Sequence, residues 1–111
     1  MSASQFGLTN LTVIVDVNGC QSDGHTDLIM DKSGLRDRFG AFGFHSVEID
    51  GHDIQGILNA IACRDSTRPN AIIAKTVKGK GISFMENNPD WHHGSLSTEQ
   101  YECARSELLN L

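Results

Sequence analysis

The hydrophobic residues of this chain follow two different periodicities, and the first is that of strands. Residues 10–16 and 70–77 form short runs rich in apolar and β-branched side chains, and residues 45–50 alternate between apolar and polar. Runs of this length predict strands, and a run that is apolar on both faces is typical of a strand inside a parallel sheet. We therefore expect three strands that share one parallel sheet.

Helical spacing appears between these strands. Residues 32–42 place apolar side chains on one helical face, with Ser33 suited to cap the start and Gly43 suited to follow the end. A second helix is expected to begin after Asp53 as its N-cap and to run to Cys63. Its apolar stripe, which we expect to be buried, consists of Ile54, Ile57, Leu58 and Ile61.

A third helix is expected at the end of the chain, over residues 98–109. Ser97 and Gln100 have the spacing of a capping box, which marks a helix start. The resulting order, β-α-β-α-β-loop-α, predicts a parallel three-layer α/β sheet with right-handed crossovers. Sheets in such folds usually have about five or six strands. We therefore expect these three strands to be part of a larger sheet.

Length and charge exclude several classes of protein. The 111 residues suit a single domain, and the net charge of −5 offers no electrostatic footprint for nucleic acid or an anionic membrane. Residues 11–17, the longest apolar stretch, are too few to cross a bilayer, and residues 1–9 lack the pattern of a signal peptide. The three cysteines lie far apart and form no CxxC, which favours a reduced, cytoplasmic protein.

Chemistry is expected where the strands end, because ligands of open α/β sheets bind beyond the carboxyl ends of the strands. Residues 16–24 follow the first strand and offer Asp and Asn oxygens, which suit Mg²⁺ or Ca²⁺. The loop after the third strand carries His92 and His93 beside Trp91. A third segment, residues 50–53, lies at the end of the second strand along the chain.

Each of these features also has a purely structural interpretation. Asn18 and Gly19 form a common turn pair, and Asp53 is explained as a helix N-cap. Two adjacent histidines are often polar surface residues, and Cys20 has no identifiable base beside it, so its thiol is expected to be inert. The segment 78–81, Lys-Gly-Lys-Gly, lacks the spacing of a phosphate-binding loop.

Taken together, the motifs resemble one family along nearly the whole chain. From about residue 8 to residue 109, their order and spacing are similar to the amino-terminal, diphosphate-binding domain of transketolases, and more narrowly to the separate N-terminal subunit of two-gene transketolases. The motifs are NLTVIVDVNGCQSDG (10–24), FGAFGF (39–44), VEIDGHD (47–53), AKTVKGKGISFMEN (74–87) and WH (91–92).

The resemblance implies a site for thiamine diphosphate bound through Mg²⁺. Asn18 falls on the family's metal-ligand asparagine, and the carbonyl of Cys20 falls on its backbone metal ligand. Asp16 matches an acidic residue that lines the cofactor pocket, and Ser22 stands where a bulkier apolar residue normally packs against the cofactor. His92 matches a histidine that contacts the diphosphate and assists proton transfer; whether His92 or His93 faces the site stays open.

The resemblance also implies what lies outside these residues. The Gly-Asp-Gly that begins the family's cofactor motif is absent here, as is the pyrimidine-binding domain. We therefore expect residues 1–111 to be an incomplete domain of an oligomeric transketolase, which passes a two-carbon ketol unit between sugar phosphates and needs upstream sequence and a pyrimidine-binding partner subunit. The alternative is a catalytically inactive fragment that acts as a scaffold or pairing domain. Deoxyxylulose-phosphate synthase, a related branch, matches the motifs less well.

Overall fold

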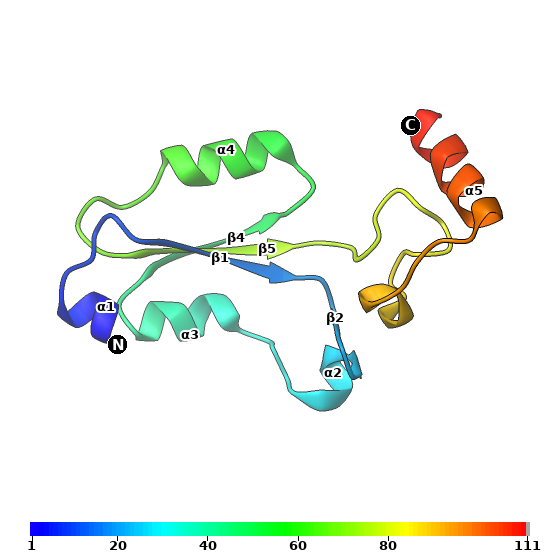
Figure 1. Cartoon of the computed structure of the whole chain (residues 1–111). Coiled ribbons are helices and arrows are strands. Elements are labelled where there is room, and N and C mark those ends of the chain that lie inside the picture. The colour runs from blue at the N-terminus through cyan, green and yellow to red at the C-terminus, as the bar shows by residue number, and fades with distance from the viewer. Residues whose placement is uncertain (111) are drawn as a thin grey trace. The chain divides into compact units, whose positions relative to one another are not determined.

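The computed structural model describes residues 1–110, which divide into two compact parts. The first part consists of residues 1–17 and 32–76, and the second of residues 18–31 and 77–110. Figure 1 labels most of the elements of both parts. Each part is described separately below.

The first part is built on a parallel sheet of three strands, as the sequence predicts. β1 (Thr12–Val17) and β4 (His45–Asp50) flank the central strand β5 (Asn70–Lys75). The register aligns Ile14 with Ile72 on one side and Val47 with Ile72 on the other. Five of the six β5 residues are buried, because this strand has a neighbour on each edge and helices over the sheet.

Helices cover both faces of this sheet. α3 (Leu35–Ala41) and α4 (Ile54–Ala62) lie on opposite sides of it, and the short α1 (Ser2–Gln5) lies on the side of α3 (Figure 1). The rings of Phe39 on α3 and Phe44 before β4 meet edge to face at 5.3 Å. The predicted three-layer α/β arrangement is therefore confirmed.

The helix ends agree with the sequence except at α3. Asp53 caps α4 by accepting a hydrogen bond from the Gln55 backbone N–H at 3.0 Å. Gly43, just beyond α3, has a φ of +86°, which favours glycine. The prediction that Ser33 caps α3 is wrong: the N-cap is Gly34, whose left-handed backbone (φ +66°) turns the chain into the helix.

The predicted buried stripe of α4 is also wrong. Ile54, Leu58 and Ile61 are 69%, 55% and 45% exposed, and only Ile57 is half-buried. The physical reason is the narrow sheet: α4 packs chiefly on the edge strand β4, so only one line of its side chains reaches the sheet. The helix is amphipathic, but most of its apolar face lies in solvent in this chain.

Asn70 organises the loop that leads into β5. Its side chain is almost completely buried; its Oδ1 accepts from the Asp65 backbone N–H at 2.8 Å and lies 3.1 Å from His45 Nδ1. Its Nδ2 donates to the carbonyls of Asp65 and Arg68 at 2.9 and 3.1 Å. One buried amide thus fixes both the loop before β5 and the start of β4.

The second part combines a short hairpin and two short helices with the longer helix α5. A hairpin of β2 (Cys20–Gln21) and β3 (Gly24–His25) leads into α2 (Thr26–Ile29), and the 3₁₀ helix η1 (Pro89–His92) precedes α5 (Thr98–Leu109). The predicted capping box is confirmed, since Gln100 N donates to Ser97 Oγ and Ser97 N donates to Gln100 Oε1. The sequence did not predict α1, α2, η1 or the hairpin.

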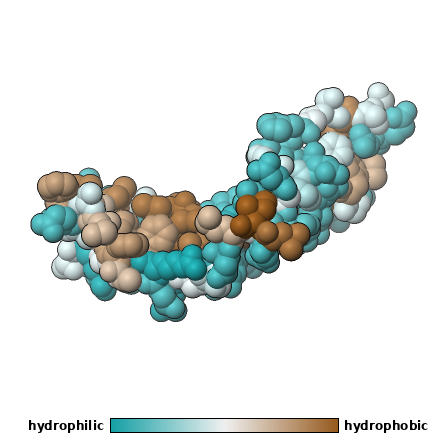
Figure 2. Space-filling model, turned by 90° about the horizontal axis from the view of Figure 1, so that it is seen from below, coloured by the Kyte–Doolittle hydropathy of each residue, from teal (hydrophilic) through white to brown (hydrophobic). Residues whose placement is uncertain are grey.

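Apolar surface and an open strand edge accompany this fold. Met1 and Phe6 at α1 and Phe42 at the end of α3 are exposed, and Figure 2 shows apolar side chains gathered over this region. β1 has one hydrogen-bonded neighbour within residues 1–110, and its Ile14 is 58% exposed. No helix among these residues has the length and apolar character needed to cross a membrane.

We expect the purified chain to self-associate, because an unpaired apolar edge strand is a template for pairing with another chain. Ile14→Lys places a charge on β1 and should shift the population toward monomer. Light scattering coupled to size-exclusion chromatography measures the change, and Asn59→Lys on the exposed surface of α4 is the matched control. A monodisperse wild-type monomer would show that the edge is protected.

Candidate functional site

The turn after β1 carries the two predicted metal ligands. Asn18 Oδ1 accepts a hydrogen bond from the Cys20 backbone N–H at 2.9 Å, and Gly19 between them has a φ of +73°. The carbonyl of Gly19 accepts from the Thr26 backbone N–H at 2.9 Å, which joins the turn to α2. Both Asn18 and Cys20 are half-buried. The turn predicted from Asn18 and Gly19 is confirmed, and it holds the Asn18 amide in one orientation.

The chemistry of this turn fits a hard cation. Asn18 Oδ1 is an amide oxygen, a hard ligand atom, and here it accepts from the Cys20 N–H. Amide and carbonyl oxygens are ligands that Mg²⁺ takes in proteins. Among the residues that the structure describes there is no group of three or more His, Cys, Asp or Glu side chains able to hold a metal. The turn itself offers two oxygens, the Asn18 amide oxygen and the Cys20 carbonyl.

Asp16 lies at the carboxyl end of β1, as predicted, but in the first part of the chain. Its carboxylate accepts a hydrogen bond from the Thr76 hydroxyl, and Thr76 N donates to the Val17 carbonyl at 3.2 Å. These bonds join the segment after β5 to the end of β1. The Asp16 side chain is thereby anchored just before the Asn18 turn.

His92 and Ser22, two of the predicted site residues, line one cleft. The cleft has a volume of about 310 Å³ and lies where η1 contacts the β2–β3 hairpin. Neither imidazole of the pair His92 and His93 has a hydrogen-bond partner within residues 1–110, and their rings meet edge to face at 4.5 Å. The remaining lining residues are Asp23, Gly24, Pro89, Asp90 and His93. Both histidines line the cleft, so the choice between them stays open.

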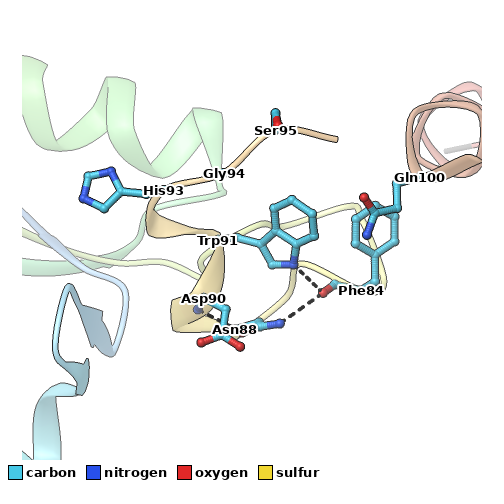
Figure 3. A pocket seen from close by; sticks show the side chains of 8 residues that line it. All are labelled: Phe84, Asn88, Asp90, Trp91, His93, Gly94, Ser95 and Gln100. Atoms are coloured by element: carbon cyan, nitrogen blue, oxygen red, sulfur yellow. Dashed lines mark hydrogen bonds between the residues drawn. The ribbon is translucent and has the colours of Figure 1, made fainter. Parts of the chain in front are cut away.

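The loop that presents His92 is held by its own residues. Asn88 Oδ1 accepts from the Asp90 backbone N–H at 3.0 Å and so caps η1, with Pro89 at its first position. The Trp91 indole N–H donates to the Phe84 carbonyl at 3.1 Å, and the two rings pack 5.4 Å apart (Figure 3). Trp91 thus anchors the loop, and the adjacent His92 is left exposed.

The sequence pattern does not predict the hairpin, and so it does not predict Asp23 and Asp90 as neighbours of His92. Two-residue strands carry no periodic signal that could reveal a hairpin. The segment Asn88-Pro89-Asp90 does carry a signal, since a capping Asn followed by Pro is typical of a helix start.

Two other candidates have structural roles: Asp53 is an N-cap, and residues 78–81 form a turn. The expectation that no base lies beside the Cys20 thiol is wrong, since Cys20 Sγ is 3.9 Å from His25 Nδ1 across the β2–β3 hairpin, which the sequence does not predict.

Glu107 on α5 anchors the segment that leads to the histidine loop. Its carboxylate accepts from the Ser83 hydroxyl and from the Ser83 backbone N–H, both at 2.6 Å. These hydrogen bonds, the hydroxyl's first, hold the pKa of Glu107 below its ordinary value of 4.5. The stabilisation from the carboxylate is therefore fully present above pH 4.5 and is lost as the pH falls through the lowered pKa.

We expect Glu107→Gln to lower the melting temperature of the chain at pH 7. The difference from wild type should shrink only as the pH falls through the lowered pKa of Glu107, because the protonated carboxyl and the amide that replaces it are then both neutral. Thermal unfolding followed by circular dichroism at pH 7 and at a pH below that pKa measures this, and Glu102→Gln, on the same helix, is the control. An equal difference at both pH values would assign the effect of Glu107 to packing rather than charge.

Comparison with known proteins assigns the chain to a family. The model of "Transketolase, thiamine diphosphate binding domain" matches residues 1–109. The chain is 39% identical over 110 residues to an apulose-4-phosphate transketolase subunit of Phocaeicola vulgatus, covering 97% of this chain and 39% of that protein. It is 38% identical over 103 residues to a 6-deoxy-6-sulfo-D-fructose transketolase subunit of Clostridium sp. (strain MSTE9), covering 91% and 38%.

A solved structure agrees with these relatives. The transketolase of Campylobacter jejuni superposes with a TM-score of 0.86 at 31% sequence identity, over 96% of this chain and 17% of that one. The chain therefore belongs to the transketolase thiamine diphosphate-binding domain family. It spans about two fifths of the length of the transketolase subunits it matches.

Proposed function

We propose that this chain is the part of a thiamine diphosphate- and Mg²⁺-dependent transketolase that holds the metal and the diphosphate. The observation that carries the proposal is the turn at Asn18 and Cys20, whose amide and carbonyl oxygens have the chemistry of Mg²⁺ ligands. The family membership of the chain supports the same cofactor. The assembled enzyme would move a two-carbon ketol unit from a ketose phosphate to an aldose phosphate.

In this mechanism the chain binds and orients the cofactor, and one of its histidines transfers a proton. Thiamine diphosphate, when bound, supplies the carbon–carbon chemistry through its own thiazolium ring. Asn18 Oδ1 and the Cys20 carbonyl would hold the metal, and Ser22 would line the wall of the diphosphate site. His92 would donate a hydrogen bond to the diphosphate and pass a proton through an imidazole nitrogen on the substrate side. Asp16, anchored by Thr76, would line the same pocket.

A partner completes the proposed enzyme. Two relatives bear the names of transketolase subunits, which implies that a second subunit completes each of those enzymes. We propose that the partner of this chain is a pyrimidine-binding subunit, and that additional protein sequence supplies the remaining metal ligands. All three cysteines are free thiols, which supports the cytoplasm as the location.

The second candidate is an inactive scaffold or pairing fragment. It is favoured by one observation: the described residues supply the two turn oxygens, and no cluster of three metal-ligating side chains occurs among them. In that case the chain would keep the fold without loading the cofactor. In the first candidate Asn18 contributes to cofactor binding and activity, whereas in the second it contributes to stability alone.

A chimeric enzyme separates the two candidates. The chain replaces the matching segment of the Phocaeicola vulgatus transketolase subunit, which is then produced with its own partner. We expect ketol transfer that requires thiamine diphosphate and Mg²⁺ and that is lost in Asn18→Ala. A folded, assembled chimera without activity, beside an active parent enzyme, would favour the scaffold.

A further inference from the structure

A second hollow lies beside the histidine loop, around the chain's single tryptophan. Its volume is about 500 Å³, and it lies entirely within the second part of the chain. The face of Trp91, the ring of Phe84, the Gly94 backbone and the side chains of Ser95 and Gln100 surround it (Figure 3). Asn88, Asp90 and His93 complete its lining, and Asp90 and His93 also line the His92 cleft.

The indole at its centre is held in place. Its N–H is occupied by the Phe84 carbonyl at 3.1 Å, and its ring packs against the Phe84 ring. The indole therefore has no free donor and can offer a ligand only its apolar face and edge. Gly94 runs beside the six-membered ring, and a Cβ there would lie 3.8 Å from Trp91 Cε3 and Cζ3. The missing side chain leaves that part of the ring uncovered.

Uncharged polar groups flank this aromatic surface. Gln100 projects from α5 with its amide turned toward the indole (Figure 3). Its Oε1 accepts from the Ser97 backbone N–H at 2.9 Å, while its Nε2 and the Ser95 hydroxyl have no hydrogen-bond partner within residues 1–110. A ligand in the hollow would contact the flat indole face, the Gln100 amide and the Ser95 hydroxyl, with the side chains of Asn88, Asp90 and His93 completing the lining.

These features together select a class of ligand. A sugar ring has an apolar C–H face, which the negative face of an aromatic ring attracts, and a rim of hydroxyls that donate and accept hydrogen bonds. Asp90 lines the same hollow with a negative charge, which disfavours a phosphate group. We propose that the Trp91 hollow binds a neutral sugar. The hollow shares Asp90 and His93 with the His92 cleft, but none of the proposed cofactor-binding residues Asn18, Cys20, Ser22 and His92 lines it, so the proposal does not depend on the proposed function.

The single tryptophan makes the test direct, because fluorescence excited at the red edge of the aromatic absorption, where Tyr101 does not absorb, reports Trp91 alone. We expect D-ribose and D-fructose to change this fluorescence along a saturating curve. Sorbitol, an open-chain polyol without a ring to stack, should change it weakly and without saturation. No saturation with either sugar, or an equal response to sorbitol, would overturn the proposal. Saturation with inorganic phosphate instead of sugar would also overturn it.

Two variants test whether the fluorescence change arises from sugar bound in the hollow. Ser95→Ala removes one hydroxyl and should weaken sugar binding by about three- to tenfold, the usual effect of one lost hydrogen bond. Gly94→Ala adds a methyl about 3.8 Å from the indole and covers part of the ring; because the φ of Gly94 is +158°, which side chains rarely adopt, circular dichroism must first show that this variant is folded. Ser66→Ala, an exposed serine in the first part, is the control. Unchanged sugar affinity in both hollow variants, with wild-type circular dichroism, would contradict the proposal.

Discussion

Replacing His92 by alanine is expected to lower the kcat of the chimeric transketolase by about 100-fold or more, the usual contribution of a positioned acid–base group. His92 lines the cleft with Ser22, and its ring has no hydrogen-bond partner within residues 1–110, so it is available to a bound substrate. Because the loop is anchored by Trp91 and Asn88, the substitution should leave the fold intact. Steady-state kinetics of ketol transfer measures the effect.

His93 provides the matched comparison. It is adjacent to His92 in sequence, lines the same cleft and is similarly exposed, so His93→Ala removes the same chemistry from the neighbouring position. We expect His93→Ala to retain most of the activity. A larger loss in His93→Ala than in His92→Ala would assign the catalytic role to His93, and wild-type activity in both variants would exclude a catalytic imidazole in this cleft.

Replacing Asn70 by alanine is expected to destabilise the first part of the chain by about 3 kcal/mol, because truncation leaves several buried groups without partners. The Asp65 backbone N–H and the carbonyls of Asp65 and Arg68 would all lose the amide that now satisfies them. Asn70 is also the first residue of the central strand, so water cannot easily replace its side chain. Urea unfolding followed by circular dichroism measures the loss.

Asn59→Ala is the control for this measurement. Asn59 lies on the exposed surface of α4 and accepts a hydrogen bond from Gln55 Nε2 at 3.0 Å. Substitutions at such surface positions usually change stability by less than about 0.5 kcal/mol. Equal midpoints for Asn59→Ala and Asn70→Ala would show that the buried amide does not organise the loop.

The strands and the capped helices are predictable because their signals are local. The alternation at residues 45–50 predicts a strand, which is β4, and Asp53 and Ser97 cap the helices that their sequence positions indicate. A cap depends on one side chain and the backbone a few residues away, so tertiary context rarely overrides it. At α3 the backbone conformation of Gly34 decides the start instead of the Ser33 side chain.

Burial is less predictable, since it depends on what an element packs against. The apolar stripe of α4 has helical spacing, but a sheet of three strands offers it too little surface, and Ile54, Leu58 and Ile61 are exposed. At the site, too, local features can be predicted and contacts between distant segments cannot. The turn at Asn18 and Gly19 can be predicted from local preferences, whereas the cleft shared by Ser22 and His92 depends on a contact between segments about 70 residues apart.

The central claim is that the Asn18 turn holds the metal and the diphosphate. It is tested most directly by the melting temperature of the purified chimera with and without thiamine diphosphate and Mg²⁺, because a ligand of the folded state must raise that temperature. We expect a clear rise that requires both components and disappears in Asn18→Ala, while Asn59→Ala keeps it. An undiminished rise in a folded Asn18→Ala variant would contradict the claim.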